Sequence, residues 1–228
     1  LGDVYKRQSA HRIDKSRSMV SRRLDQAREA GLVEVRVRHP LRTDAELERR
    51  LCQEYNLAEA RVLAEPPDDY RILLRRRGEL GARCLQESLH PGIIIGLSWG
   101  SAVHAVVSAM PTSPVPNSTI VQLIGAVGPG DPMVDGVELG RWLAQKIGAS
   151  FRFLSAPLLV KDEAVALALL SERINQETLT IAAQAEVAVI GIGTPVPEYS
   201  SLLRAGYLSR SDLEELMEAG VVGDIVAH

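Results

Sequence analysis

Cysteine, lysine, aromatic residues and long apolar runs are all scarce in this sequence of 228 residues. The two cysteines, Cys52 and Cys84, form no CxxC motif, so neither a disulfide framework nor a zinc site is predicted. No apolar run approaches the roughly 18 residues that cross a bilayer, and no secretory signal pattern is present. We therefore expect a cytoplasmic protein without membrane contact, bound metal or cofactor.

The charge of the chain is unevenly distributed. Hydrophobic residues make up 46% of the chain and the net charge is −3, an ordinary globular composition. However, residues 11–42 contain nine Lys and Arg against four Asp and Glu, so the rest of the chain is acidic. A basic segment of this kind is typical of a nucleic-acid-binding arm, because cations placed on phosphates release counterions. A solvated helix face explains the charge equally well.

The basic segment carries a helix pattern followed by a strand pattern. Apolar residues recur at helical spacing through residues 14–30, and Gly31 provides a C-cap. Residues 32–38 then alternate apolar and polar, as a half-buried strand does. Helix, glycine and ribbon together predict the second half of a winged helix-turn-helix. Its exposed face would bind phosphates and guanine edges through Ser16, Arg17, Ser18, Ser21 and Arg22.

The remainder of the chain alternates between helix and strand patterns. A capping box that starts at Thr43 predicts a linker helix within 43–56. Strands are predicted at 60–63, 93–97, 119–124, 151–154 and 187–192. Helices are predicted at 69–89, 102–110, 136–147, within 162–185, and after a cap at Ser211. Continuous apolar strands separated by helices predict an α/β fold with a parallel sheet covered on both faces.

Glycine-rich turns follow three of the predicted strands. Residues 96–101 read GLSWGS, residues 122–130 read QLIGAVGPG, and residues 191–195 read GIGTP, with glycines at Gly191 and Gly193. Ligands of parallel sheets bind beyond the carboxyl ends of the strands. Backbone amides, small hydroxyls and a helix N-terminus at this edge would suit a phosphate. We therefore predict an anion-binding edge.

Two enzymatic interpretations compete with simple binding. Residues 96–100 match G-x-S-x-G, but an esterase also needs an acid and then a histidine downstream. Only His104, six residues after the serine, and the terminal His228 follow it, which disfavours an esterase. A sugar-phosphate isomerase or deaminase would need a base near these turns, and this alternative stays open. The candidates are Asp131, Asp135 and Asp224, of which Asp224 would end a later strand, whereas Asp131 and Asp135 are more typical of turn or capping residues. Lys161 is the one lysine near a strand end, and we interpret it as a surface residue.

Several motifs together resemble a known family. The sequence is similar to SorC/DeoR-type bacterial sugar-sensing transcriptional regulators over nearly all of residues 11–227. The resemblance is carried by SRSMVSRRL at 16–24, AREAGLV at 27–33, GLSWGSA at 96–102, VQLIG at 121–125, SAP at 155–157, GIG at 191–193 and VGDI at 222–225. It implies a regulator rather than an enzyme. Its partners would be operator DNA, a carbohydrate or phosphorylated sugar as effector, and further copies of itself in a dimer or tetramer.

The resemblance also implies a fold and roles for single residues. The effector domain would share the sheet of sugar-phosphate isomerases and deaminases. Ser98, Gly100 and Ser101 would hold a phosphate, and Gln122 and Gly125 would line the sugar site. Two further residues, Arg204 and Asp224, would close it.

The same resemblance suggests how the chain is divided and where it departs from the pattern. Residues 1–8 match nothing and are expected to be a non-native leader. Residues 9–42 would be a partial helix-turn-helix, 43–56 a linker helix, and 57–228 an effector domain truncated at its C-terminal end. Ala102 replaces a threonine that is common in relatives, so one phosphate-binding hydroxyl is missing. Ile124 stands where one branch has a Schiff-base lysine, so covalent sensing is not expected.

Overall fold

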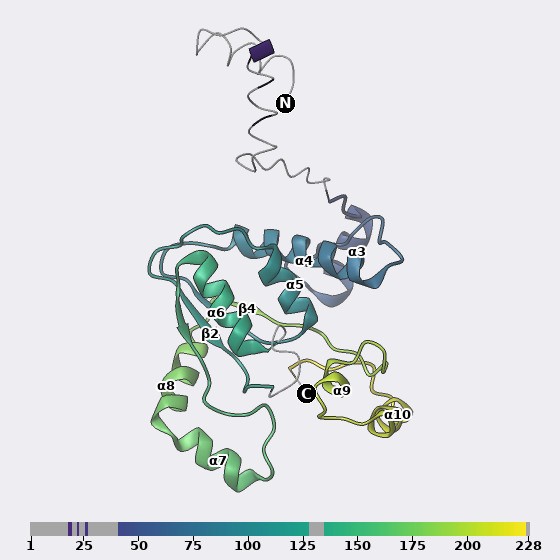
Figure 1. Ribbon diagram of the computed structural model, residues 1–228. Helices are drawn as coiled ribbons and strands as arrows, with labels where there is room; N and C mark the ends of the chain where they lie inside the picture. Colours follow the sequence, from purple (N-terminus) through teal and green to yellow (C-terminus); the bar gives the residue numbers. More distant parts are fainter. Residues whose placement is uncertain (1–17, 20–21, 23–25, 27–40, 128–134, 227–228) are drawn as a thin grey trace. The chain divides into compact units, whose positions relative to one another are not determined.

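A computed structural model describes residues 18–19, 22, 26, 41–127 and 135–226 (Figure 1). The chain divides into two units, Leu1–Pro40 and Leu41–His228. In the first unit, the described residues are helical with exposed side chains and lie within the helix predicted at 14–30. The ribbon predicted at 32–38 and the leader predicted at 1–8 lie outside the described residues.

The second unit is built on a four-stranded parallel sheet, as the alternation of strands and helices predicted. The strand order is β3-β2-β1-β4. The strands are β1 (Ile94–Leu97), β2 (Thr119–Gln122), β3 (Ser150–Arg152) and β4 (Val187–Val189). At the centre of the sheet, Ile95 of β1 is paired with Ile120 of β2 on one side and with Val187 of β4 on the other. The apolar runs in β1 and β2 are buried, which suits central strands of a parallel sheet.

Helices connect and flank the strands of this unit. The described helices are α3 (Ala45–Tyr55), α4 (Tyr70–Glu87), α5 (Ser101–Ala109), α6 (Gly136–Ile147), α7 (Glu163–Ser171), α8 (Arg173–Ala182), α9 (Ser201–Arg204) and α10 (Arg210–Glu218). The predicted end of α6 is confirmed, because Gly148 is left-handed with φ 66° and its N–H bonds the carbonyl of Ala144. Not one described helix is both long enough and apolar enough to span a membrane.

The main core lies between β1, β2 and the helices α4, α5 and α6. Its buried members include Ile95 and Ile120 from the strands, Val107 from α5, and Leu139 and Leu143 from α6. Figure 1 shows α4 and α5 lying beside each other. Each fully buried side chain of this size contributes about 1.5–3 kcal/mol relative to exposure. This core fixes the sheet from which the glycine-rich turns emerge.

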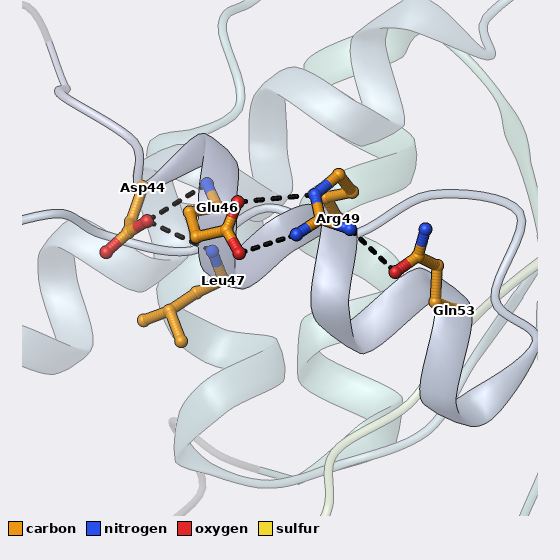
Figure 2. Close-up of polar contacts among 5 residues, drawn as sticks. All are labelled: Asp44, Glu46, Leu47, Arg49 and Gln53. Atoms are coloured by element: carbon orange, nitrogen blue, oxygen red, sulfur yellow. Dashed lines mark hydrogen bonds and ion pairs between the residues drawn. The ribbon is translucent and has the colours of Figure 1, made fainter.

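Helix α3 begins one residue later than the capping box predicted. Its N-cap is Asp44, whose carboxylate accepts from the amides of Glu46 (3.1 Å) and Leu47 (3.0 Å), as Figure 2 shows. The prediction of Thr43 as the cap is wrong. Glu46 does not reach back to the chain before the helix, because its carboxylate binds the guanidinium of Arg49.

Two other predictions from the sequence are also wrong. Residues 60–63 form no sheet strand, because the Val62 N–H donates to the Glu48 carboxylate (2.9 Å) and its carbonyl accepts from Asp44 (2.9 Å). The cap of α10 is Ser209 rather than Ser211. Asp212 lies three residues after Ser209, which is the spacing that a reciprocal capping box requires.

Candidate functional site

The glycine-rich turns that follow β1, β2 and β4 meet at one edge of the sheet. The amide of Ser98, just after β1, donates to the carbonyl of Val189 in β4 (3.0 Å). On the other side, the amide of Leu123 after β2 donates to the carbonyl of Leu97 in β1 (3.0 Å). Gly191 lies next to the backbone of Trp99, since a Cβ there would be 3.8 Å from its carbonyl oxygen. The turn after β1 therefore contacts the turn after β4, and its Trp99 packs in one cluster with Ile124 and Val127 of the turn after β2.

The turn after β1 leads directly into a helix N-terminus. Ser98 is buried, and Gly100 is the N-cap of α5 with φ 108° and open space where a side chain would lie. Ser101 is the first residue of the helix, one residue before the predicted start. Gly100 provides no side-chain cap, so the first amides of α5 are available to an external acceptor. This geometry suits an anionic group.

Gln122 lies at the end of β2, in the middle of the sheet, and is fully buried. Its Oε1 accepts from the amide of Leu154 (3.2 Å), which fixes the direction of the side-chain amide. Its Nε2 has no hydrogen-bond partner among the described residues. A buried donor without an acceptor is costly, by about 1–3 kcal/mol. Gln122 is therefore ready to donate to an oxygen that the described chain does not supply.

A small space adjoins this unpaired donor. A Cβ on Gly136, the first residue of α6, would lie 3.4 Å from Gln122 Nε2, 3.5 Å from the Ser98 carbonyl oxygen and 3.7 Å from Trp99 Cβ. These are ordinary contact distances, so the glycine leaves room for about one small group between a donor and an acceptor. A hydroxyl, which both donates and accepts, suits such a pair.

Gly125 is required for the contact between the turn after β2 and the loop after β3. A Cβ at Gly125 would overlap the carbonyl of Pro157. Next to it, the Ala126 amide donates to the Ala156 carbonyl (2.8 Å) and the Ala126 carbonyl accepts from Leu158 (2.8 Å). The motif predicted at 155–157 thus supports the site through its backbone.

Sequence reasoning missed the residue that anchors this loop. Asn175 of α8 is buried, and its Oδ1 accepts from the Ser155 amide (2.8 Å). Its Nδ2 donates to the carbonyls of Ser155 (3.3 Å) and Leu169 (2.8 Å). The available signal was an asparagine inside an amphipathic helix, a residue that disfavours helix interiors unless its side chain has partners.

The two residues predicted to close the site, Asp224 and Arg204, differ in whether they lie near the turns. Asp224 lies beside the GIG turn, because its carbonyl accepts from the Gly193 amide (2.8 Å) and its side chain lies against the Cα of that glycine. This segment forms only an isolated bridge rather than the strand expected before Asp224. The Arg204 side chain is exposed on α9 and donates to the Ser201 hydroxyl (2.9 Å). No described contact brings Arg204 to the turns.

In the described parts of the chain, neither a bond from His104 Nε2 to Ser98 nor a cluster of metal-ligand side chains is found. His104 lies in α5 with its ring 5.6 Å from that of Trp142, and its Nε2 has no partner within the described chain. It therefore forms no hydrogen bond to Ser98 through that nitrogen. No group of three or more His, Cys, Asp or Glu side chains in the described parts is arranged for a metal. Lys161 is exposed, and Asp135 caps α6 as its alternative role predicted.

The predicted DNA contacts are described only in part. Ser18 and Arg22 are helical and have exposed side chains, which agrees with a recognition-helix face. Ser16, Arg17 and Ser21 lie outside the described residues, as does Asp131.

A parallel sheet with a polar, glycine-lined edge at the carboxyl ends of its strands places the second unit in the class of α/β ligand-binding domains. Residues 39–228 match the family described as “Putative sugar-binding domain”, and the chain belongs to that family. The matched residues include all four described strands and the turns that follow them.

Individual relatives agree with this assignment. The chain is 28% identical over 226 residues to the deoxyribonucleoside regulator of Bacillus subtilis (strain 168), which covers 99% of this chain and 72% of that protein. It is 30% identical over 223 residues to the transcriptional regulator LsrR of Klebsiella pneumoniae, with 95% and 65% covered. The crystal structure of the full-length sorbitol operon regulator SorC from Klebsiella pneumoniae matches with a TM-score of 0.77 and 26% identity, over 97% of this chain and 72% of that one.

These comparisons confirm the resemblance to SorC/DeoR-type regulators that the motifs predicted. They also confirm the prediction of a sugar-responsive regulator over an enzyme, because each of these relatives is a transcriptional regulator. The chain spans about two thirds to three quarters of the length of these relatives.

Proposed function

We propose that the edge formed by the turns after β1, β2 and β4 binds a carbohydrate effector that controls operator affinity. The observation that carries this proposal is the buried Gln122 Nε2 without a partner in the described chain, beside the Ser98 carbonyl and the space left by Gly136. A sugar hydroxyl placed there satisfies the donor and uses the acceptor. The proposed effector contacts at the turns are Ser98, Gly100, Ser101, Gln122, Gly125, Gly191, Gly193 and Asp224. Arg204, whose side chain is exposed on α9, is proposed to close the site when the effector binds.

The effector of this proposal is a polyol, a sugar or a sugar phosphate. Relatives of the chain are named for deoxyribonucleosides, sorbitol and erythritol, each of which carries more than one hydroxyl group. The open N-terminus of α5 at Gly100 and Ser101 would hold the phosphate of a phosphorylated effector. In this proposal, the fold is that of sugar-phosphate isomerases and deaminases, but the edge of the sheet binds the effector and does not convert it.

A thermal-shift screen tests the effector site. The panel contains D-sorbitol, erythritol, D-ribose, 2-deoxy-D-ribose and D-ribose 5-phosphate. A ligand at about 100 times its Kd stabilises the folded protein by about 2.7 kcal/mol. Gln122→Leu should abolish the shift, and Gln145→Leu, which changes an exposed glutamine on α6, should retain it. Absence of stabilisation by every member of the panel would reject the proposal.

The DNA-binding half of the proposal assigns residues 9–42 to a partial helix-turn-helix, residues 43–56 to a linker helix and residues 57–228 to the effector domain. Arg22, exposed on a helix, would contact a phosphate or a guanine edge. Arg22→Ala should weaken binding to the DNA upstream of the gene and reduce the dependence of log K on log salt by about one unit if Arg22 contacts a phosphate. The control is Arg173→Ala, which removes the same charge from a side chain that is 90% exposed in the second unit. Equal affinities of the two variants would remove Arg22 from the interface.

The proposed regulator is a cytoplasmic homo-oligomer. Support comes from α7, which is apolar along most of its length yet has no buried residue. Val165, Leu167 and Leu170 of α7 are 41–58% exposed. A helix that is apolar on all sides is normally covered. Light scattering should give a mass at least twice 24.8 kDa, and a monomer at micromolar concentration would contradict this part of the proposal.

A further inference from the structure

A second apolar cluster lies directly behind the turns of the proposed site. Its buried members are Trp99 from the turn after β1, and Ile124 and Val127 from the turn after β2. Leu202 and Tyr207, on and just after α9, pack against this cluster. The α9 segment is therefore in contact with two of the turns whose spacing determines the shape of the site.

Tyr207 connects this segment to the second turn by a specific polar contact. Its hydroxyl donates to the carbonyl of Val127 at 2.9 Å, although the two residues are 80 positions apart in the chain. Burial, and next the negative charge of Asp135, raise the pKa of Tyr207, so its hydroxyl keeps its proton and remains a donor. Asp135 is the N-cap of α6. Tyr207 thus lies at the junction of the turn after β2 and the start of α6.

The backbone around Tyr207 is shaped to present this hydroxyl. Gly206 is left-handed with φ 78°, a conformation in which other residues are strained. The reversal is closed by the Tyr207 and Leu208 amides, which donate to the Leu202 carbonyl at 3.0 and 3.4 Å. The chain therefore turns back sharply after α9, and the tyrosine ring reaches the cluster.

We propose that Tyr207 is a positioning residue that fixes the turn after β2 against the turn after β1 and so keeps the effector site in its binding geometry. The inference rests on the proposed function for its effect on binding, but its mechanical part is independent of any ligand. Without the hydroxyl, the Val127 carbonyl loses its anchor while the ring still fills its place. The turns then open more often, and Trp99 becomes more accessible.

The experiment uses Trp99 as a reporter. The chain has two tryptophans, so Trp142→Phe leaves Trp99 as the single tryptophan, whose emission is observed separately from that of tyrosine by excitation at the red edge of the absorption band. In this background and without ligand, Tyr207→Phe should increase the Stern–Volmer constant for acrylamide quenching of Trp99 by about two- to tenfold. This factor corresponds to the net free energy of one lost hydrogen bond. Gly206→Ala, which strains the same reversal, should act in the same direction.

Two controls separate positioning from general destabilisation. Tyr199→Phe removes a tyrosine hydroxyl from a residue that is 45% exposed. Val107→Ala weakens the main core without altering the second cluster. If Tyr207→Phe and Gly206→Ala are quenched no more than these controls at equal fractions folded, the inference is overturned.

Binding measurements distinguish this inference from the proposed function. D-sorbitol and D-ribose 5-phosphate are titrated against the parent and Tyr207→Phe. If the parent binds a probe, the variant should bind it about two- to tenfold more weakly, and equal affinity would overturn the positioning role. If the parent binds neither probe, the effector assignment loses support, and the quenching result alone decides whether Tyr207 holds the turns.

Discussion

Asn175→Ala should destabilise the protein more than alanine at the exposed polar residues of α8, because Asn175 is buried. Asn175 makes three hydrogen bonds, one as acceptor and two as donor, to the loop after β3 and to the end of α7. At about 1 kcal/mol net for each bond, the loss is about 3 kcal/mol. The better helix propensity of alanine returns about 0.5 kcal/mol, so we expect a net loss of about 2–3 kcal/mol.

The assay is reversible thermal unfolding followed by circular dichroism. For a chain of this length, a loss of 2–3 kcal/mol lowers Tm by about 4–12 °C. Gln176→Ala is the matched control, because Gln176 is the next residue of α8 and its side chain is exposed. A Tm for Asn175→Ala within about 1 °C of the control would show that the three bonds exchange with water at no net cost, which would contradict the anchoring role of Asn175.

Three further perturbations have definite expected outcomes. Gly125→Ala should cost about 2–3 kcal/mol in a chemical unfolding experiment, because its Cβ overlaps a backbone carbonyl, whereas Gly191→Ala should be tolerated at ordinary contact distances. The carbonyl of Pro91 and the carboxylate of Glu186 raise the pKa of His90. Protonated His90 therefore stabilises the fold below about pH 6.5, and this stabilisation is lost as the pH rises through the raised pKa. An NMR titration in which Glu186→Gln leaves the pKa of His90 unchanged would contradict the pairing. Lys146→Met should cost about 1–2 kcal/mol, because the ammonium donates to two carbonyls at the end of α5, and unchanged urea denaturation would exclude this role.

Much of the sheet could be predicted because its signals are local. The apolar runs that became β1 and β2 are long enough to identify buried strands, and Gly148 can end α6 through its own backbone conformation. The false strand at 60–63 shows the limit of such signals. There the backbone groups of Val62 bond to Glu48 and Asp44, and neither partner is marked in the local pattern.

The candidate site was predicted less completely than the sheet. Glycines that follow strands can be read directly from the sequence, because chain order places the turns of a parallel sheet at one edge. The supports of those turns come from distant segments. Asn175 contacts a loop 20 residues away, and Tyr207 contacts a carbonyl 80 residues away, so no sequence window contains both partners. The shape of the site therefore depends on tertiary packing that short motifs do not encode.

The position of β4 beside β1 has a consequence for how ligand preference can change. The chain completes β2 and β3 on one side of β1 before it returns to add β4 on the other side. Residues 191–193, which belong to the proposed effector site, thus follow an edge strand of only three residues. If these residues contact the proposed effector, substitutions there should change which effector is bound while the pairing of β1 with β2 is preserved. Related chains can then recognise different effectors on the same two central strands.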